Sequence, residues 1–169
     1  TIVGTDSNSA AVTENATITA SGTLTVTDND TGEGAFNTTP AFTTTDGSAL
    51  GSLTINSTGT WGYSVLDSAI QHLDAGDQVV EKFTVTTADT KDNEIITITI
   101  NGAEDKSSIT VAGTNNQGTV TEDTAVTDVS GVGKLVATGT LGVTDADGDG
   151  AFNTAVTFTS STSTGGSKL

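Results

Sequence analysis

The sequence predicts an all-β fold, an Ig-like antiparallel β-sandwich with about seven strands in each repeat. Three observations predict it. Apolar residues alternate with Thr at a period of two rather than 3.6, which is typical of strands with one buried and one solvated face. Thr occupies 37 of the 169 positions, and it suits the solvated face because it is β-branched yet polar. Clusters of Gly, Asn, Asp and Ser separate the alternating segments at short intervals, as a sandwich requires.

The alternation places the elements along the chain. Apolar residues alternate with Thr over 23–27, over 83–86 and over 96–100, and each of these segments is expected to form a strand. One helical turn is expected over Ser68–Leu73. It is followed by Gly76, a residue that readily adopts the left-handed conformation that ends helices. We therefore expect a single short helical turn among strands.

The chain contains an internal repeat. Residues 1–15 (TIVGTDSNSAAVTEN) match residues 110–123 (TVAGTNNQGTVTED). Residues 21–38 (SGTLTVTDNDTGEGAFNT) match residues 138–154 (TGTLGVTDADGDGAFNT). The sequence match with the first copy therefore extends through most of the second half of the chain.

This match sets the expected domain organisation. Residues 1–105 are expected to form one complete Ig-like repeat, and residues 106–169 the first part of a second, truncated repeat cut from a longer tandem array. A half sandwich cannot bury its inner faces alone. Either the missing half was lost, or strands from another copy complete the second repeat by strand addition.

The composition excludes several classes of function. The formal charge is −16, from 21 acidic residues and five Lys, and such a surface repels nucleic acid. No apolar run approaches the roughly 20 residues of a membrane helix, so no membrane insertion is expected. Cys is absent, which excludes disulfides and Cys-based metal sites. The single His, His72, lies on the expected helical turn, where surface packing is the simpler role. We expect no enzyme activity.

The sharpest local motif is an acidic loop after an expected strand. Asp145, Asp147 and Asp149 alternate with small residues and are followed by Gly150, which allows a sharp turn. Carboxylates at this spacing turn oxygens inward around one hard cation such as Ca²⁺. The loop is not an EF-hand, because the twelfth position, which requires a bidentate Glu, is Val156. Additional ligands must therefore come from elsewhere.

The first repeat carries a looser version of this loop. Asp28, Asp30 and Glu33 occupy the same place after the matching strand, with one extra residue in the loop. Recurrence at one point of the repeat favours a metal-binding role. The alternative is that acidic turn residues merely cap and solvate strand ends, and this is the simpler interpretation for most of the 21 acids.

The sequence resembles the VCBS-type repeat, an Ig-like or cadherin-like module of very large bacterial surface adhesins of the RTX type. The resemblance covers residues 1–105 and, in truncated form, 106–169. It is carried by the following residues: Val12-Thr13-Glu14, Gly22 to Asp28 with Asp30 and Phe36, Gly51 to Ile55, Gly59 to Tyr63, Ile70 to Leu73, Gly76, Phe83 to Asp89, and Ile96 to Gly102. The repeat ends in Gly102-Ala103-Glu104-Asp105, where the family usually has Gly-Thr-Asn-Asp-Ala-Pro.

The resemblance implies a passive, extracellular role. Such modules form the extender that holds terminal adhesive domains away from a bacterial cell, in attachment or biofilm formation, with calcium rigidifying the array. The expected partners are neighbouring repeats of the same polypeptide, and the expected location is secreted, at the cell surface or in the matrix. Extracellular calcium sites are typically filled at about 0.1–1 mM.

The resemblance also suggests which residues complete the metal shell. Asp28 and Asp145 each end an expected second strand, so each lies at one pole of its repeat. If repeats join head to tail, Asp145 and Asp147 face Glu104 and Asp105, as cadherin-like junctions pair an Asp-x-Asp loop with an acidic linker.

Further ligands are expected from the first repeat. Glu14, near the end of the first strand, and either Asp67 or Asp77, beside the helical turn, are the candidates to complete the shell.

Two other functions remain open from the sequence. A self-assembling extracellular filament, completed by strand exchange between copies, predicts polymers of this chain. A glycan-binding module predicts an exposed aromatic pair, for which Trp61 and Tyr63 are the candidates, although such residues more often fill a sandwich core.

Overall fold

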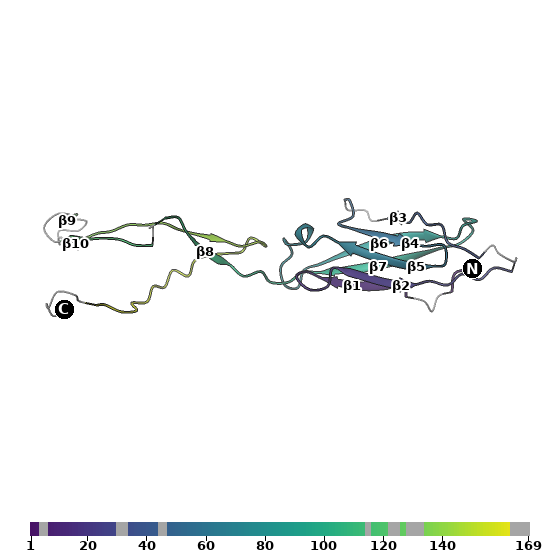
Figure 1. Ribbon diagram of the computed structural model, residues 1–169, viewed down its shortest axis with the longest axis horizontal. Helices are drawn as coiled ribbons and strands as arrows, with labels where there is room; N and C mark the ends of the chain where they lie inside the picture. The colour runs from purple at the N-terminus through teal and green to yellow at the C-terminus, as the bar shows by residue number, and fades with distance from the viewer. Residues whose placement is uncertain are drawn as a thin grey trace. The chain divides into compact units, whose positions relative to one another are not determined.

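The computed structural model describes residues 1–3, 7–29, 34–43, 47–113, 116–121, 126–127 and 134–162. The chain forms two compact units. The first comprises Thr1–Lys106 together with Ala146–Gly148, and the second comprises Ser107–Asp145 together with Asp149–Leu169. Strands of both units are labelled in Figure 1.

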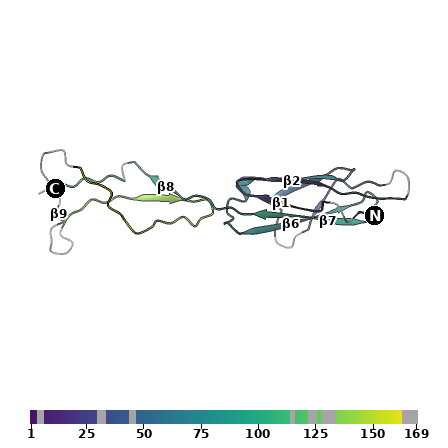
Figure 2. The same ribbon diagram turned by 90° about the horizontal axis from the view of Figure 1, so that it is seen from below.

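The first unit contains two sheets (Figures 1 and 2). One has the strand order β1-β7-β6-β3 and the other the order β2-β5-β4. All neighbours are antiparallel except β1 and β7, which run parallel. The strands are β1 (Ser9–Thr13), β2 (Thr19–Thr23), β3 (Ala41–Phe42), β4 (Gly51–Ile55), β5 (Thr60–Val65), β6 (Gln78–Thr86) and β7 (Asn93–Asn101). The prediction of an all-β, mostly antiparallel, sandwich-like fold is confirmed.

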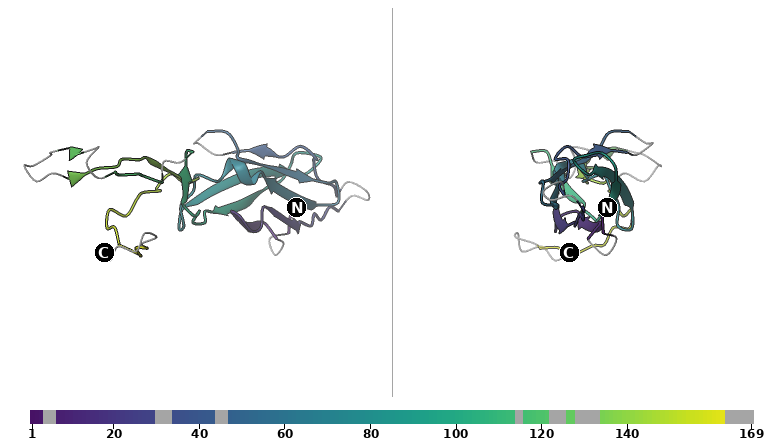
Figure 3. Two further views of the ribbon diagram at one scale, coloured as in Figure 1. Left: turned by 60° about the vertical axis from the view of Figure 1, so that its left-hand side comes forward. Right: turned by 90° about the vertical axis from the view of Figure 1, so that its right-hand side faces the viewer.

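The alternating segments bury their apolar side chains between the two sheets. Figure 3 shows the ribbon of these sheets from two further directions. Ile96, Ile98 and Ile100 of β7 are completely buried. The rings of Tyr63 on β5 and Phe83 on β6 meet edge to face with centroids 6.0 Å apart, which joins the two sheets. Each such buried side chain stabilises the fold by roughly 1.5–3 kcal/mol relative to exposure.

Trp61 lies at the centre of this core. Its side chain is 1 % exposed, and its indole Nε1–H donates to the carbonyl of Ser7 at 2.7 Å. Gly22, opposite Trp61 in the β2–β5 ladder, is required here because a Cβ at this position would lie 2.5 Å from the indole ring. Tyr63 is also buried, so neither aromatic ring offers a face to a sugar. The interpretation that these two residues fill the sandwich core is confirmed, and they do not form the exposed aromatic pair that a glycan-binding module predicts.

A buried carboxylate ties the two sheets together beside Tyr63. Glu81 of β6 is 2 % exposed, and its Oε2 accepts a hydrogen bond from the Tyr63 hydroxyl at 2.7 Å. Its Oε1 accepts from the backbone N–H groups of Leu50 and Gly51. Burial, and then the hydrogen bond to Glu81 and its negative charge, raise the pKa of the Tyr63 hydroxyl far above its usual value near 10. The hydroxyl therefore stays a donor at any physiological pH.

Replacing Tyr63 by Phe is expected to lower the free energy of unfolding by about 1–3 kcal/mol at pH 7, because it leaves a buried carboxylate oxygen of Glu81 without its donor. The same variant should change the pH dependence. The raised pKa in the folded state stabilises the wild type below about pH 10, and this contribution is lost as the pH rises further. Urea unfolding between pH 7 and pH 11 measures both effects.

The two proteins differ only at residue 63, so the difference between their two pH profiles isolates the contribution of Tyr63. Tyr63 is the single Tyr of the chain. A Tyr63→Phe variant that loses stability above pH 10 as steeply as the wild type would contradict this assignment.

Two element predictions differ from the structure. The strand expected over 23–27 does not form as one strand. β2 ends at Thr23, Leu24 still bonds to the carbonyl of Gly59 in the turn between β4 and β5, and residues 25–27 then bond to residues 1–3. Gly59 takes a φ of +91° there. The helical turn expected over Ser68–Leu73 is a 3₁₀ helix over Asp67–Ala69, one residue earlier at its start, followed by further turns. Gly76 does take a positive φ, of +101°.

The second unit has fewer strands in its described part. β8 (Ser108–Val111) pairs antiparallel with β11 (Leu141–Thr144), and β9 (Val126–Thr127) pairs antiparallel with β10 (Lys134–Leu135). Across the described ranges of both units, no helix has the length and apolar character that crossing a membrane requires.

Apolar residues that are buried in the first unit have exposed counterparts in the second. Leu24 is 1 % exposed, whereas Leu141, at the same place in the repeat, is 40 % exposed. Phe36 is 2 % exposed and its counterpart Phe152 is 44 % exposed. The described part of the second unit therefore leaves uncovered a face that strands cover in the first.

Candidate metal centre

The end of the sandwich at which β1 and β7 finish gathers acidic side chains. Because these two strands are parallel, their carboxyl ends lie at one edge, and the N–H of Glu14 bonds to the carbonyl of Asn101 at 3.0 Å. Glu14, the first residue after β1, is 1 % exposed. Its Oε2 accepts a hydrogen bond from the N–H of Ala103 at 3.0 Å. Glu14 is thereby fixed beside the segment that follows β7.

Asn15 draws two further carboxylates to the same place. It has a φ of +56°, a left-handed conformation that Asn tolerates better than most residues. Its backbone N–H donates to Oδ1 of Asp67 at 2.9 Å, and its side-chain amide donates to Oδ1 of Asp105 at 2.9 Å. One residue thus joins the start of the 3₁₀ helix to the segment after β7.

The amide of Gln71 completes this network. Its Nε2 lies 2.9 Å from Oε1 of Glu14 and 3.3 Å from Oδ2 of Asp67. It also lies 3.0 Å from Oδ1 of Asn15. An amide nitrogen has two hydrogens for these three acceptors. The carboxylates of Glu14 and Asp67 therefore share one neutral donor.

The segment after β7 adds Glu104 and Asp105, and Asp147 is hydrogen-bonded to this segment. The N–H of Asp105 donates to Oδ2 of Asp147 at 3.2 Å. Carboxylate oxygens of Glu104 and Asp147 lie within 4.8 Å of one another. The acidic cluster of the first unit thus consists of Glu14, Asp67, Glu104, Asp105 and Asp147.

The acidic cluster contains a buried carboxylate oxygen that lacks a donor. Oδ2 of Asp105 is buried and accepts no hydrogen bond within the described part of the chain. Nor does any described Lys side chain form an ion pair with Glu14, Asp67 or Asp105. A buried carboxylate oxygen without a partner costs several times the worth of an ordinary hydrogen bond. A cation bound to it would remove this cost and the repulsion among the neighbouring carboxylates.

The donor set fits a hard cation. All the ligand atoms that the cluster offers are oxygens, from carboxylates, the Asn15 side chain and backbone carbonyls. Ca²⁺ takes six to eight such oxygens in flexible geometry. Zn²⁺ prefers nitrogen and sulfur ligands, and Mg²⁺ is usually held by one or two carboxylates and keeps several waters. The residues present therefore fit calcium best.

The structure places several of the residues expected from the sequence in the acidic cluster. Glu14, Glu104, Asp105 and Asp147 belong to the acidic cluster. Of the alternatives Asp67 and Asp77, Asp67 joins it, whereas Asp77 accepts a backbone hydrogen bond from Gly102 through its carbonyl.

The other two carboxylates of the Asp145–Gly150 loop belong to the second unit. Asp145 accepts a hydrogen bond from the Ser107 hydroxyl at 2.6 Å, and Asp149 is exposed. The positive φ of the loop, +92°, falls on Gly148 rather than on Gly150, to which the sequence assigned the sharp turn.

The first-repeat loop lies elsewhere. Asp28 is exposed and follows Thr27, whose N–H bonds to the carbonyl of Thr1, at the end of the sandwich where β7 begins. Asp30 and Glu33 lie outside the described residues. His72 is exposed on the turn after the 3₁₀ helix.

Sequence reasoning missed Asn15 and Gln71. Asn15 carried one usable signal, because an Asn directly after a strand is a common left-handed residue. No local pattern marks Gln71, whose role depends on contacts with residues more than 50 positions away.

The chain matches no protein-family model, and a search of curated proteins finds no significant match.

Proposed function

We propose that the chain is a structural spacer of a secreted bacterial adhesin, of the VCBS-type family that its sequence resembles. In this proposal, calcium bound by the acidic cluster stiffens the polypeptide where it leaves the first unit, and the spacer acts in surface attachment or biofilm formation. The proposal rests on one observation. Oδ2 of Asp105, which belongs to the acidic cluster with four other carboxylates, is buried and accepts no hydrogen bond from the described residues.

The strand order supports an Ig-like classification. In the Ig fold one sheet contains strands B-E-D and the other C-F-G. The sheet orders β2-β5-β4 and β3-β6-β7 correspond to these, with β1 beside β7 rather than beside β2. A tandem arrangement of such modules, each starting where the last one ends, is the proposed architecture of the parent protein.

The charge supports a passive extracellular role. A formal charge of −16 keeps neighbouring fibres soluble and apart, but it also strains the compact state through self-repulsion. Calcium relieves this repulsion and binds the folded form, so it stabilises by mass action. Millimolar calcium outside the cell would fill sites of this type, whereas cytosolic calcium would not.

Protease cleavage after Lys106 tests the proposal directly. Lys106 is exposed and follows Glu104 and Asp105 of the acidic cluster. If calcium holds this segment, cleavage requires release of the ion, and calcium at ten times its Kd should slow the cleavage about tenfold. A lysine-specific protease that is itself independent of calcium would be used in EDTA, in CaCl₂ and in MgCl₂, with the product identified by mass.

Two variants with the same change of charge separate calcium binding from general electrostatics. Glu14→Gln removes a carboxylate from the cluster and should lose the protection. Glu94→Gln lies at the start of β7, at the other end of the sandwich, and should keep it. Equal cleavage rates in EDTA and CaCl₂ for the unsubstituted chain would overturn the proposal.

A further inference from the structure

Asn101 and Gly102, at the end of β7, form the single Asn-Gly pair of the sequence. An Asn side chain is converted to Asp or isoaspartate when the backbone nitrogen of the next residue attacks its amide carbon. Gly at the next position favours this attack, because it has no Cβ to hinder the approach and its backbone turns freely. The chain therefore carries one chemically reactive pair, and it lies beside the acidic cluster.

The fold requires Gly at position 102. A Cβ on Gly102 would lie 2.4 Å from the carbonyl oxygen of Asp74 and 2.7 Å from the Cβ of Leu73. Both contacts are too short for any other residue to fit without moving the backbone. The reactive pair thus cannot be removed by replacing its Gly.

The side chain of Asn101 joins three strands. Its Nδ2 donates to the carbonyl of Val12 on β1 at 3.1 Å, and its Oδ1 accepts from Nε2 of Gln78 on β6 at 2.8 Å. The backbone of Asn101 is also paired on both sides, with Thr13 in β1 and with Gln78 in β6. Both ends of the amide and both edges of the backbone are therefore engaged.

These contacts keep the reacting atoms apart. The N–H of Gly102, which is the attacking group, donates to the carbonyl of Asp77 at 3.0 Å. For the attack, the Asn101 amide must turn from the neighbouring strands toward its own backbone and give up both of its hydrogen bonds. The reaction therefore requires the end of β7 to open locally, as the ends of strands do in native proteins.

We propose that Asn101 is a modification site that its two side-chain hydrogen bonds block in the folded chain and that reacts when the end of β7 opens. The Gly102 nitrogen loses its proton and bonds to Cγ of Asn101, and the side-chain nitrogen leaves with that proton as ammonia. Water then opens the resulting succinimide at either of its two carbonyls, which gives Asp or isoaspartate. Each conversion consumes one water and releases one ammonia, with no oxidation or reduction.

The product cannot restore the original contacts. An ionised Asp at this position has no hydrogen to donate, so one of its oxygens would face the carbonyl oxygen of Val12. It would also add a negative charge close to Glu14, whose N–H bonds to the carbonyl of Asn101. Isoaspartate adds a methylene to the backbone and breaks the register of β1 with β7. A transient opening would thus become permanent.

The rate of conversion in the intact 169-residue chain tests the proposal. The reference is the free peptide DNEIITITINGAEDK, residues 92–106, which a lysine-specific protease also releases from the chain for mass spectrometry. Both are incubated at the same mildly alkaline pH in EDTA, so the outcome is separate from that of the calcium proposal. Conversion at Asn101 is expected to be at least about tenfold slower in the chain than in the peptide.

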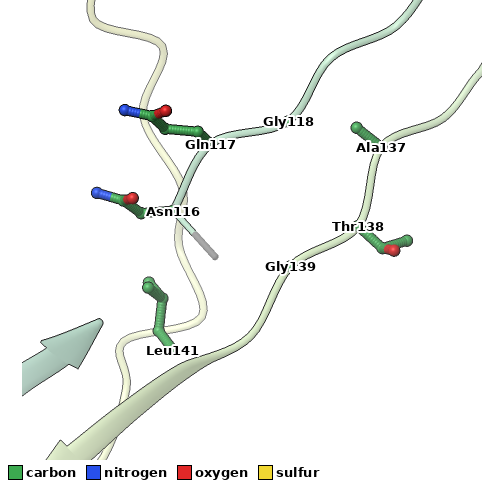
Figure 4. Close-up of a pocket in the computed structure, with 7 residues that line it drawn as sticks. All are labelled: Asn116, Gln117, Gly118, Ala137, Thr138, Gly139 and Leu141. Atoms are coloured by element: carbon green, nitrogen blue, oxygen red, sulfur yellow. The ribbon is translucent and has the colours of Figure 1, made fainter. Parts of the chain in front are cut away.

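Two Gln variants show whether the side-chain contacts provide the protection. Gln78→Ala removes the donor to Oδ1 of Asn101 and should raise the rate of conversion about threefold, as the loss of one hydrogen bond allows. Gln117→Ala makes the same truncation in the second unit, at the exposed side chain labelled in Figure 4, and should leave the rate unchanged.

A pair of Asp variants tests the consequence of the modification. Asn101→Asp reproduces one product and should lower the melting temperature by about 4 °C or more. Asn93→Asp adds the same charge at the exposed start of the same strand and should lower it less.

Equal rates of conversion in the intact chain and in the free peptide would overturn the proposal, and this comparison depends on no variant. A Gln78→Ala chain that reacts no faster than Gln117→Ala would overturn it as well. Equal melting temperatures of Asn101→Asp and Asn93→Asp would contradict the predicted consequence.

Discussion

Replacing Trp61 by Ala is expected to lower the free energy of unfolding of the first unit by about 3–5 kcal/mol. The indole is 1 % exposed, and it is held by the Ser7 carbonyl and by close packing on Gly22. Its removal leaves a cavity between the two sheets and an unpaired carbonyl. A loss of this size is a large part of the 5–15 kcal/mol that stabilises a typical domain.

Urea unfolding followed by circular dichroism measures this loss, since the variant has no Trp fluorescence. Leu66→Ala serves as the control, because Leu66 is 73 % exposed and its replacement should change the stability by less than about 0.5 kcal/mol. A Trp61→Ala variant as stable as Leu66→Ala would show that the indole is not at the centre of the core.

Millimolar calcium is expected to raise the melting temperature of the first unit substantially. At 10 mM, calcium is at about 10–100 times a Kd of 0.1–1 mM, so each bound ion stabilises the folded state by about 1.4–2.7 kcal/mol. In a domain of about 100 residues, 1 kcal/mol shifts the midpoint by roughly 4–8 °C, so one ion should raise the midpoint by about 5 °C or more. The physical reason is that the cation pairs the buried Oδ2 of Asp105 and neutralises the adjacent carboxylates.

Calorimetric or circular-dichroism melts in EDTA and in CaCl₂ measure this shift. Because salt alone screens repulsion among surface charges, NaCl is added to the EDTA sample to match the ionic strength. Equal midpoints in the two matched buffers would mean that the acidic cluster binds no calcium in the folded state.

The fold was predictable where one pattern decided it. Ile96, Ile98 and Ile100 alternate with Thr, and they lie in β7 with their side chains buried, because a strand between two neighbours must turn one face to the core. The alternation at Leu24 and Val26 looks the same in the sequence. Leu24 lies just outside β2, and the residues after it bond to residues 1–3 at the start of the chain. That contact has no local signature.

The candidate site was predictable only in part. The acidic loop after a strand pointed to Asp147, and the end of the first strand pointed to Glu14. Glu104 and Asp105 came from the resemblance to cadherin-like junctions. The choice of Asp67 over Asp77 depends on the left-handed turn at Asn15, which aims its N–H at Asp67. The sequence pattern does not reveal this hydrogen bond, because it joins residues 52 positions apart in the chain.

The most direct test of the account is a calorimetric calcium titration of the chain and of two variants with the same change of charge. Asp105→Asn leaves an oxygen for the Asn15 amide but replaces Oδ2 by a nitrogen, which cannot bind a cation. Asp77→Asn changes an exposed carboxylate near the same end of the sandwich but outside the acidic cluster. The account predicts calcium binding at a Kd of about 0.1–1 mM, unchanged in Asp77→Asn and weakened at least about tenfold in Asp105→Asn. No binding by the unsubstituted chain, or equal binding by all three proteins, would contradict it.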